Sequence, residues 1–301
     1  MYAAVVTSFD SAPRYQQFPT PVPAGDGELL VDVLAAGLHP RVRSQANGSH
    51  YTSTDELPLV PGIDGVGRGP DGLLRYFILP DTTMGAMAGQ TVIDTRRSIV
   101  LPESSDPVAV AAGMNPAMSS WVALRQRVKL HAGQNVLVLG ATGNAGKLAI
   151  QVAKLFGANT IVGAGRRADR LAELPALGAT DTVLLDGDPG DIAHRLGKAA
   201  TDVDVVIDYL WGEPTAAAML AVVTARADRS KPLTWIEIGS VAGPTAAIPS
   251  AALRAARLQI VGSGQGSVGP REILTELPAL ADQITNGTFD IDAHPMPLAD
   301  V

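Results

Sequence analysis

The chain has 301 residues, of which 46% are apolar and 18% charged, and its formal net charge is −7. These proportions favour well-packed cores in one large or two ordinary domains and exclude a mainly disordered chain. The sequence has no dense run of lysine and arginine, so a nucleic acid is not expected as a partner. No apolar run reaches the roughly 20 residues of a transmembrane helix. The sequence contains no cysteine, which excludes disulfides, iron–sulfur clusters, thiolate nucleophiles and thiolate zinc sites.

The N-terminal third has the pattern of β structure. Residues 1–10 alternate like a strand and lack the basic region of a secretory signal, so we expect a cytoplasmic location. Turns rich in proline and glycine separate three candidate strands, at residues 2–8, 28–37 and 75–80. The chain up to about Asp94 is therefore predicted to be mostly β.

From about Ser119 the pattern changes to strands that alternate with amphipathic helices, which is typical of βαβ units and a parallel sheet. Six candidate strands begin at residues 135, 160, 182, 203, 234 and 258. Six strands form a complete doubly wound dinucleotide-binding sheet of the Rossmann type. The predicted fold class is therefore α/β Rossmann, preceded by a mostly β domain.

Two helices of this half are predicted in detail. The helix at 144–156 has an apolar stripe that includes Ala149 and Val152, with Lys147, Gln151 and Lys154 turned away. A last helix is expected at 270–287. The strand-like segment TFDIDAHPM, residues 288–296, follows it.

A glycine-rich turn follows the strand NVLVLG, with glycines at every third position. Residues without Cβ let backbone N–H groups approach a pyrophosphate, and the N-terminus of the following helix adds a partial positive charge. A simple tight turn between strand and helix is the alternative. The strand before the glycines and the helix after them favour a dinucleotide site. The cofactor-binding candidates here are Gly140, Thr142, Gly143, Asn144, Ala145 and Gly146.

The end of the second strand predicts which dinucleotide binds. About 20 residues after the glycine turn, NAD-binding sheets carry an acidic residue for the ribose 2′-hydroxyl. This chain instead has Gly165, Arg166 and Arg167, so no carboxylate would repel a 2′-phosphate and two guanidinium groups can bind it as a fork. The alternative is that both arginines are solvated at a helix start. We predict NADPH as the cofactor.

Three segments resemble the medium-chain dehydrogenase/reductases: AAGLHP, LPLVPGIDGVG and the run from NPAMSSW to KLFGA at 115–158. The resemblance covers nearly the whole chain. It implies a GroES-like domain at residues 1–118, to which 270–301 return, and a Rossmann domain at 119–269. Such proteins are often dimers joined through the Rossmann-domain edges, so a homodimer is expected.

The resemblance is to the zinc-free, quinone oxidoreductase-like branch. Zinc-dependent members typically have Gly-His-Glu where this chain has Gly62, Ile63 and Asp64, and they use at least one cysteine. The five histidines show no tight ligand spacing, so no metal site is expected.

Members of this branch transfer a hydride from NADPH to a quinone or an α,β-unsaturated carbonyl. Without a metal, hydrogen-bond donors must stabilise the negative charge that develops on oxygen. The resemblance points to Tyr51, because similar reductases place a tyrosine shortly before the Pro-Gly motif, and His39 stands where they usually have asparagine. A half-buried aromatic ring at Tyr51 and an imidazole satisfied by local backbone at His39 are the alternatives.

Further cofactor contacts lie at later strand ends. The resemblance assigns Ser119 to the nicotinamide or its ribose, and Tyr209 and Leu210 to the adenosine. Open parallel sheets bind ligands at the carboxyl edge, where ordinary turn chemistry is the alternative explanation for small polar residues. The candidates that end the fifth and sixth strands there are Gly239, Ser240, Ser263 and Gly264.

The sequence thus predicts an NADPH-dependent quinone reductase-like enzyme that acts on a small electrophilic acceptor. An enoyl-thioester or enone reductase needs the same hydride geometry and remains an alternative. A catalytically silent NADPH-binding redox sensor is the alternative from another class.

Overall fold

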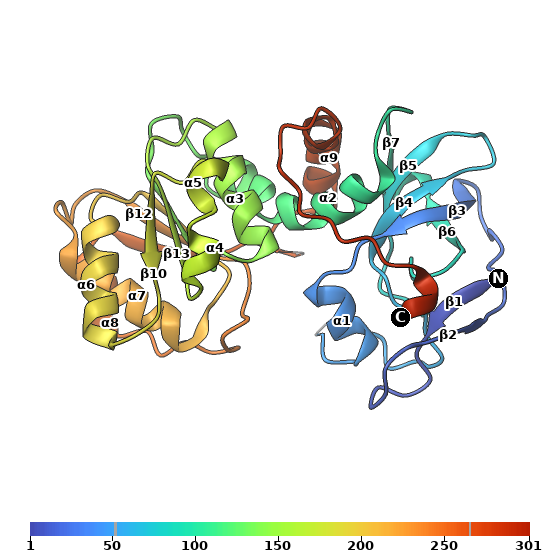
Figure 1. Cartoon of the computed structure of the whole chain (residues 1–301), viewed down its shortest axis with the longest axis horizontal. Coiled ribbons are helices and arrows are strands. Elements are labelled where there is room, and N and C mark those ends of the chain that lie inside the picture. The colour runs from blue at the N-terminus through green and yellow to red at the C-terminus, as the bar shows by residue number, and fades with distance from the viewer. Residues whose placement is uncertain (51–52, 265) are drawn as a thin grey trace. The chain divides into compact units, whose positions relative to one another are not determined.

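The computed structural model describes residues 1–50, 53–264 and 266–301. The chain divides into two compact units (Figure 1). Unit 1 comprises Met1–Pro116 and Leu274–Val301, and unit 2 comprises Ala117–Ile273. In the described part of the chain, no helix combines the length and the apolar character needed to cross a membrane.

Unit 1 is built on a five-stranded antiparallel sheet with the order β6-β3-β4-β5-β7. Its strands are β3 (Glu28–Ala36), β4 (Asp64–Arg68), β5 (Leu74–Ile78), β6 (Gln90–Asp94) and β7 (Ser98–Val100). A separate antiparallel pair consists of β1 (Tyr2–Val5) and β2 (Arg14–Gln17). The helical segments are α1 (Pro40–Ala46), η1 (Thr95–Arg97) and η3 (Leu298–Asp300), while α2 (Pro107–Val122) and α9 (Pro270–Thr285) carry the chain between the units.

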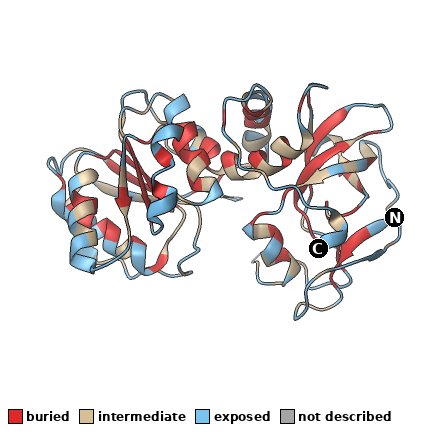
Figure 2. Ribbon diagram, viewed as in Figure 1, coloured by how far each residue is buried: buried red, intermediate tan, exposed pale blue. Residues whose placement is uncertain are grey.

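The sequence predicted three strands of unit 1, β1, β3 and β5, and did not predict β2, β4, β6 and β7. Val31, Phe77 and Ile93 lie on β3, β5 and β6 and pack into one buried cluster. The buried strands of this sheet are visible in Figure 2. By contrast, β2 is exposed at all four residues and β4 contains two glycines, so neither shows the alternation that marks a strand.

The strand predicted at 288–296 is wrong, because this segment has no regular structure in the folded chain. One of its alternating apolar residues, Ile291, packs against a helix. Ile291 lies so close to α2 that a Cβ on Gly113 would stand 2.5 Å from its Cδ1. Phe289 is also buried. The period of two therefore records burial against a helix and not strand pairing.

Unit 2 contains a six-stranded parallel sheet with the order β10-β9-β8-β11-β12-β13. Its strands are β8 (Val136–Leu139), β9 (Ile161–Gly165), β10 (Asp181–Leu184), β11 (Val205–Asp208), β12 (Leu233–Glu237) and β13 (Leu258–Gly262). The chain order reverses between β8 and β11, which makes this point the topological switch where such sheets bind ligands. The predicted fold class, a doubly wound sheet with a second mostly β domain, is confirmed.

Helices cover both faces of this sheet. In Figure 1, α6 (Pro189–Ala199), α7 (Gly212–Ala225) and α8 (Ser250–Ala255) lie on one side, and α3 (Asn144–Leu155) and α5 (Leu174–Leu177) on the other. The short α4 (Ala168–Leu171) follows β9, and a π-helical turn, η2 (Ala123–Arg127), follows α2.

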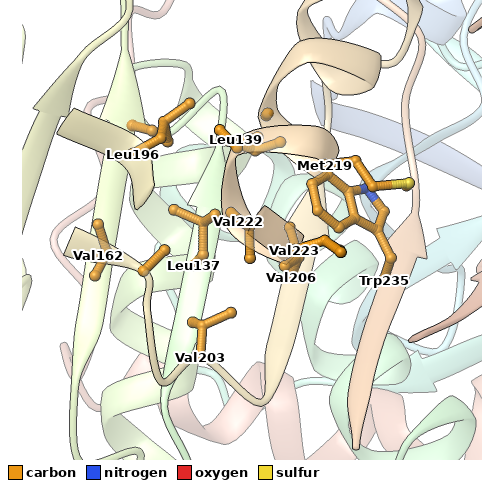
Figure 3. Close-up of a cluster of buried hydrophobic side chains, with 14 of the residues drawn as sticks. Leu137, Leu139, Val162, Leu196, Val203, Val206, Met219, Val222, Val223 and Trp235 are labelled. Carbon is orange, nitrogen blue, oxygen red and sulfur yellow. The ribbon is translucent and has the colours of Figure 1, made fainter. Parts of the chain in front are cut away.

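One hydrophobic core of unit 2 lies between the sheet and α7. Leu137, Val206 and Trp235 are paired in register on β8, β11 and β12, and Figure 3 shows their side chains facing Met219 and Val222 of α7. All five side chains are fully buried. Each such side chain stabilises the fold by about 1.5–3 kcal/mol relative to an exposed one, so this layer holds the strand ends in a fixed register.

Helix α3 is buried more widely than the sequence predicted. Ala149 and Val152 are buried as expected, but Leu148 and Gln151 are buried as well. The helix packs against α5 in addition to β8 and β9, so more than one of its faces is covered. The prediction that Gln151 turns away into solvent is therefore wrong.

Candidate functional site

The carboxyl ends of the strands in unit 2 form one row. Leu139, Asp208 and Glu237 are direct partners in the parallel register, and Gly262 continues the row on β13. The next backbone groups extend the pairing, since Tyr209 N donates to Leu139 O at 3.2 Å. This edge brings together the loops that carry the candidates Gly140, Gly165, Tyr209, Gly239 and Ser263.

The glycine turn after β8 is shaped by close backbone packing. Gly140 has a φ of +83°, a conformation that favours glycine. A Cβ on Gly146 would lie 2.3 Å from Gly140 O, so α3 can approach the turn only with glycine at this position. A Cβ on Gly143 would meet only Gly140 O, at 3.5 Å. The turn is therefore closed on the side of Gly146 and open at Gly143.

The N-terminus of α3 opens beside this turn. Its first intrahelical bond runs from Lys147 N to Gly143 O at 2.9 Å, so the N–H groups of Asn144, Ala145 and Gly146 precede the helical ladder. These groups and the helix dipole favour an anion. The side chain of Thr142 lies on the neighbouring strand end, because a Cβ on Gly165 would stand 2.6 Å from Thr142 Cγ2. The residues present fit a pyrophosphate.

The two arginines after β9 differ in their surroundings. Arg167 is bound edge-on by Asp169, with Nη2 to Oδ2 at 2.5 Å and Nε to Oδ1 at 3.2 Å. This hydrogen bonding raises the pKa of Arg167 and lowers the pKa of Asp169. Arg166 is exposed and makes no ion pair within the described part of the chain. One edge of Arg167 is therefore occupied by Asp169, and the binding of a 2′-phosphate by both guanidinium groups stays a prediction.

Ser119 and Tyr209 lie side by side. Their hydroxyl oxygens are 2.9 Å apart, and burial raises the pKa of Tyr209 to about 12, although hydrogen bonds from Ser119 and Ser120 act in the opposite direction. A Cβ on Gly140 would lie 3.3 Å from Tyr209 Cβ and 3.2 Å from Leu210 Cδ2. The resemblance assigned Ser119 to the nicotinamide or its ribose and Tyr209 to the adenosine, and in the structure their hydroxyl groups are in direct contact.

Asp208 is a structural residue of this edge that the sequence did not single out. Its Oδ1 accepts from the backbone of Leu210 at 2.8 Å and of Trp211 at 3.1 Å. Its Oδ2 accepts from Thr215 Oγ1 at 2.6 Å and from Trp235 Nε1 at 2.8 Å. Four donors fix a fully buried carboxylate, which in turn fixes the loop after β11. The signal in the sequence was an acidic residue at the end of the apolar run VVID of β11.

The remaining candidates have local partners. A Cβ on Gly239 would stand 3.3 Å from Tyr209 O, so Gly239 lies beside Tyr209. Ser240 is exposed and its carbonyl accepts from the N–H of Gly243 in a turn. Ser263 is buried after the edge strand, and Gly264 N donates to Ser267 Oγ at 2.8 Å. Turn chemistry accounts for the bonds of Ser240 and Gly264.

Unit 1 contains a second polar cluster, the His39 trio, formed by His39, Asp64 and Tyr76. His39 Nε2 lies 3.0 Å from Asp64 Oδ1, and Tyr76 OH donates to Asp64 Oδ2 at 2.7 Å. His39 is 9% exposed, whereas Asp64 and Tyr76 are fully buried. The partner of the imidazole is thus a carboxylate on β4 and not local backbone. The candidate Tyr51 lies outside the described residues.

The donor set does not fit a catalytic zinc site. Such a site needs three protein ligands and an open position. Among the residues that the structure describes, no three or more histidine, aspartate or glutamate side chains gather where they could hold a metal ion. His39 and Asp64 are a pair, and Ile63 between Gly62 and Asp64 is a buried apolar residue.

Known proteins resemble the chain in both sequence and fold. The family described as zinc-binding dehydrogenase matches residues 145–282. A probable NADPH-dependent quinone reductase, tdiC of Emericella nidulans, is 30% identical over 98% of this chain and 94% of its own length. The chloroplastic NADPH-dependent alkenal/one oxidoreductase of Arabidopsis thaliana is 28% identical over 72% of this chain and 64% of its own length.

A solved structure supports the same placement. The quinone oxidoreductase of Thermus thermophilus, whose crystal structures include a complex with NADPH, matches 96% of this chain and 86% of its own. The TM-score is 0.74 at 24% identity, which establishes a shared fold. The chain belongs to the medium-chain dehydrogenase/reductase superfamily, in its quinone oxidoreductase-like branch.

Proposed function

We propose that this protein is an NADPH-dependent oxidoreductase that reduces a quinone or an α,β-unsaturated carbonyl. The observation that carries the proposal is the glycine turn at the switch point of the sheet, closed at Gly146 and open at Gly143 beside the N-terminus of α3. The relatives that are named as NADPH-dependent reductases support the choice of cofactor and reaction.

Bound NADPH supplies a hydride to the acceptor. The N–H groups of Asn144 to Gly146 hold the pyrophosphate, and Arg166 binds the 2′-phosphate because its guanidinium group has no competing ion pair in the described chain. The paired hydroxyls of Ser119 and Tyr209 contact one group of the cofactor. Gly239, which lies beside Tyr209, completes this surface.

The chain's own polar groups must stabilise the oxygen of the acceptor. Hydride addition leaves negative charge on that oxygen, and donors placed in advance lower the barrier without reorganisation. His39 and Tyr51 are the proposed donors, and the reaction is proposed to proceed without zinc because the donor set does not fit a zinc site. The domain limits at 118/119 and 269/270 and the cytoplasmic location stay predictions.

A panel of acceptors tests the function. Purified protein is mixed with NADPH and with quinones, enals, enones or enoyl thioesters, and cofactor oxidation is followed by its near-ultraviolet absorbance. Rapid turnover of quinones supports a quinone reductase. Tight cofactor binding without oxidation by any acceptor would instead identify a silent sensor.

An enone or enoyl-thioester reductase is the second candidate. The similarity to the Arabidopsis alkenal/one oxidoreductase favours it. Both candidates need the same hydride transfer and differ only in the acceptor that the protein admits. Turnover of enals or enoyl thioesters but not of quinones would replace the first proposal with this one.

A homodimer is also proposed. Strand β13 is an edge of the six-stranded sheet, and its outer side presents a row of backbone groups that a second copy can pair with. Sedimentation equilibrium gives the mass in solution. A monomer at micromolar concentration would refute the dimer without affecting the proposed reaction.

A further inference from the structure

The His39 trio places a carboxylate where packing does not demand one. Asp64 is 0% exposed on β4, and a buried charge is costly unless it is paired and hydrogen-bonded. Apolar residues of similar volume often stabilise such positions equally well or better. The carboxylate of Asp64 is instead hydrogen-bonded at both oxygens, to His39 and to Tyr76.

Close backbone packing holds the carboxylate in place. A Cβ on Gly37 would stand 2.8 Å from Asp64 Oδ1 and 3.1 Å from Ala111 O. Gly37 N also donates to Asp64 O at 3.1 Å. The glycine that precedes Leu38 and His39 therefore lets the end of β3 lie directly against the side chain of Asp64.

Hydrogen-bond accounting assigns the proton on the imidazole. A carboxylate only accepts, and Tyr76 OH donates to its Oδ2. Burial first, and the charge of Asp64 second, raise the pKa of Tyr76 well above its ordinary value, so this phenol stays a donor. The contact between His39 Nε2 and Oδ1 then requires a hydrogen on Nε2. Nδ1 is the nitrogen left for exchange.

Nδ1 is also the nitrogen that water can reach. It has no hydrogen bond to any described residue. Nδ1 is also not buried, since the buried side-chain atoms without a partner in the described chain do not include it. His39 keeps 9% of its surface exposed, so the imidazole is anchored on one side and accessible on the other. A carboxylate–imidazole pair of this kind orients the ring.

We propose that Asp64, held by Tyr76, is a positioning residue that fixes His39 with its proton on Nε2, so that Nδ1 delivers the proton that completes reduction. This inference rests on the proposed function. Addition of the hydride forms a C–H bond and moves an electron pair of the acceptor onto its oxygen. The Nδ1–H bond of the imidazolium then breaks as an O–H bond forms. His39 is left neutral and takes its next proton from solvent.

The tautomer can be measured without cofactor or turnover. Long-range proton–nitrogen NMR distinguishes a protonated from an unprotonated ring nitrogen, and His39→Asn assigns the signals among the five histidines. In the wild-type protein, at a pH where the ring is neutral, we expect hydrogen on Nε2 and none on Nδ1. Hydrogen on Nδ1 would overturn the proposal.

Kinetics of two variants separate positioning from a purely structural role. Asp64→Asn keeps the shape but removes the charge, and we expect kcat to fall on the order of a hundredfold while KM for NADPH changes by no more than about twofold. Tyr76→Phe keeps the carboxylate, so the tautomer should stay and kcat should fall less. Circular dichroism and thermal unfolding verify that both variants fold.

Each result decides the proposal. A folded Asp64→Asn variant with the wild-type kcat overturns it, and if that variant fails to fold, the wild-type tautomer decides. If none of the acceptors in the panel leads the wild-type protein to oxidise NADPH, the proposed function is refuted, and the proton transfer with it. The NMR measurement would still show whether Asp64 fixes the ring, so the two failures are distinguishable.

Discussion

Substitution of Gly146 by alanine tests the phosphate-binding turn most directly. The new Cβ would lie 2.3 Å from Gly140 O and 2.6 Å from Ala141 Cα, where an ordinary contact begins at 3.4 Å. Both obstacles are backbone atoms, so no side-chain rotation relieves them, and the start of α3 must move by about 1 Å. A methyl group forced into a packed site costs about 1–3 kcal/mol of stability.

The same displacement removes the N–H groups of α3 from the pyrophosphate. Hydrogen bonds to a charged group contribute about 1.5–3 kcal/mol, so the Kd for NADPH should rise on the order of tenfold to a hundredfold. Calorimetric titration measures the affinity, and thermal unfolding should show a Tm lower by several degrees.

A matched variant controls for the general cost of replacing glycine. Gly25 is an exposed residue of unit 1, and a Cβ there would meet nothing within 4 Å. Gly25→Ala should therefore leave both Kd and Tm close to the wild-type values. If Gly146→Ala binds NADPH as tightly as the wild-type protein, or if the two variants behave alike, the proposed cradle is wrong.

Four further outcomes follow from the geometry of unit 2. Replacing Arg166 and Arg167 together by alanine should raise KM for NADPH on the order of tenfold or more relative to KM for NADH, and equal effects in initial-rate kinetics would contradict 2′-phosphate recognition. Asp169→Asn frees the edge of Arg167, so the Kd for NADPH should fall about twofold to fivefold while that for NADH stays constant; weaker NADPH binding would refute the competition. Asp208→Asn leaves two donors facing an amide N–H, and we expect a loss of about 2–4 kcal/mol in denaturant unfolding, where an unchanged midpoint would count against the network. The pKa of Tyr209 is raised from 10 to about 12, so its contribution to stability is present below pH 10 and lost as the pH rises towards 12; Tyr209→Phe should lack this alkaline loss in unfolding experiments, and an identical pH profile would contradict the assignment.

The sequence by itself determined the architecture of unit 2. Apolar runs of strand length that alternate with helical periods predicted six strands, and glycines at every third position placed the turn between β8 and α3. These signals are local, because backbone geometry and one-sided burial act within a few residues. In unit 1, the strands β2, β4, β6 and β7 were not predicted. The polar β2 and the glycine-containing β4 are defined by their pairing partners.

Only the tertiary structure decided which polar groups meet. His39 and Asp64 are 25 positions apart and Ser119 and Tyr209 are 90 apart, yet both pairs are within hydrogen-bonding distance. The residue types were visible in the sequence. Their partners depend on strand register and on which helix covers which face, and these follow from packing of the whole unit. The same limit applies to residues close in the sequence. The ion pair between Asp169 and Arg167 could not be predicted without the path of the chain after β9.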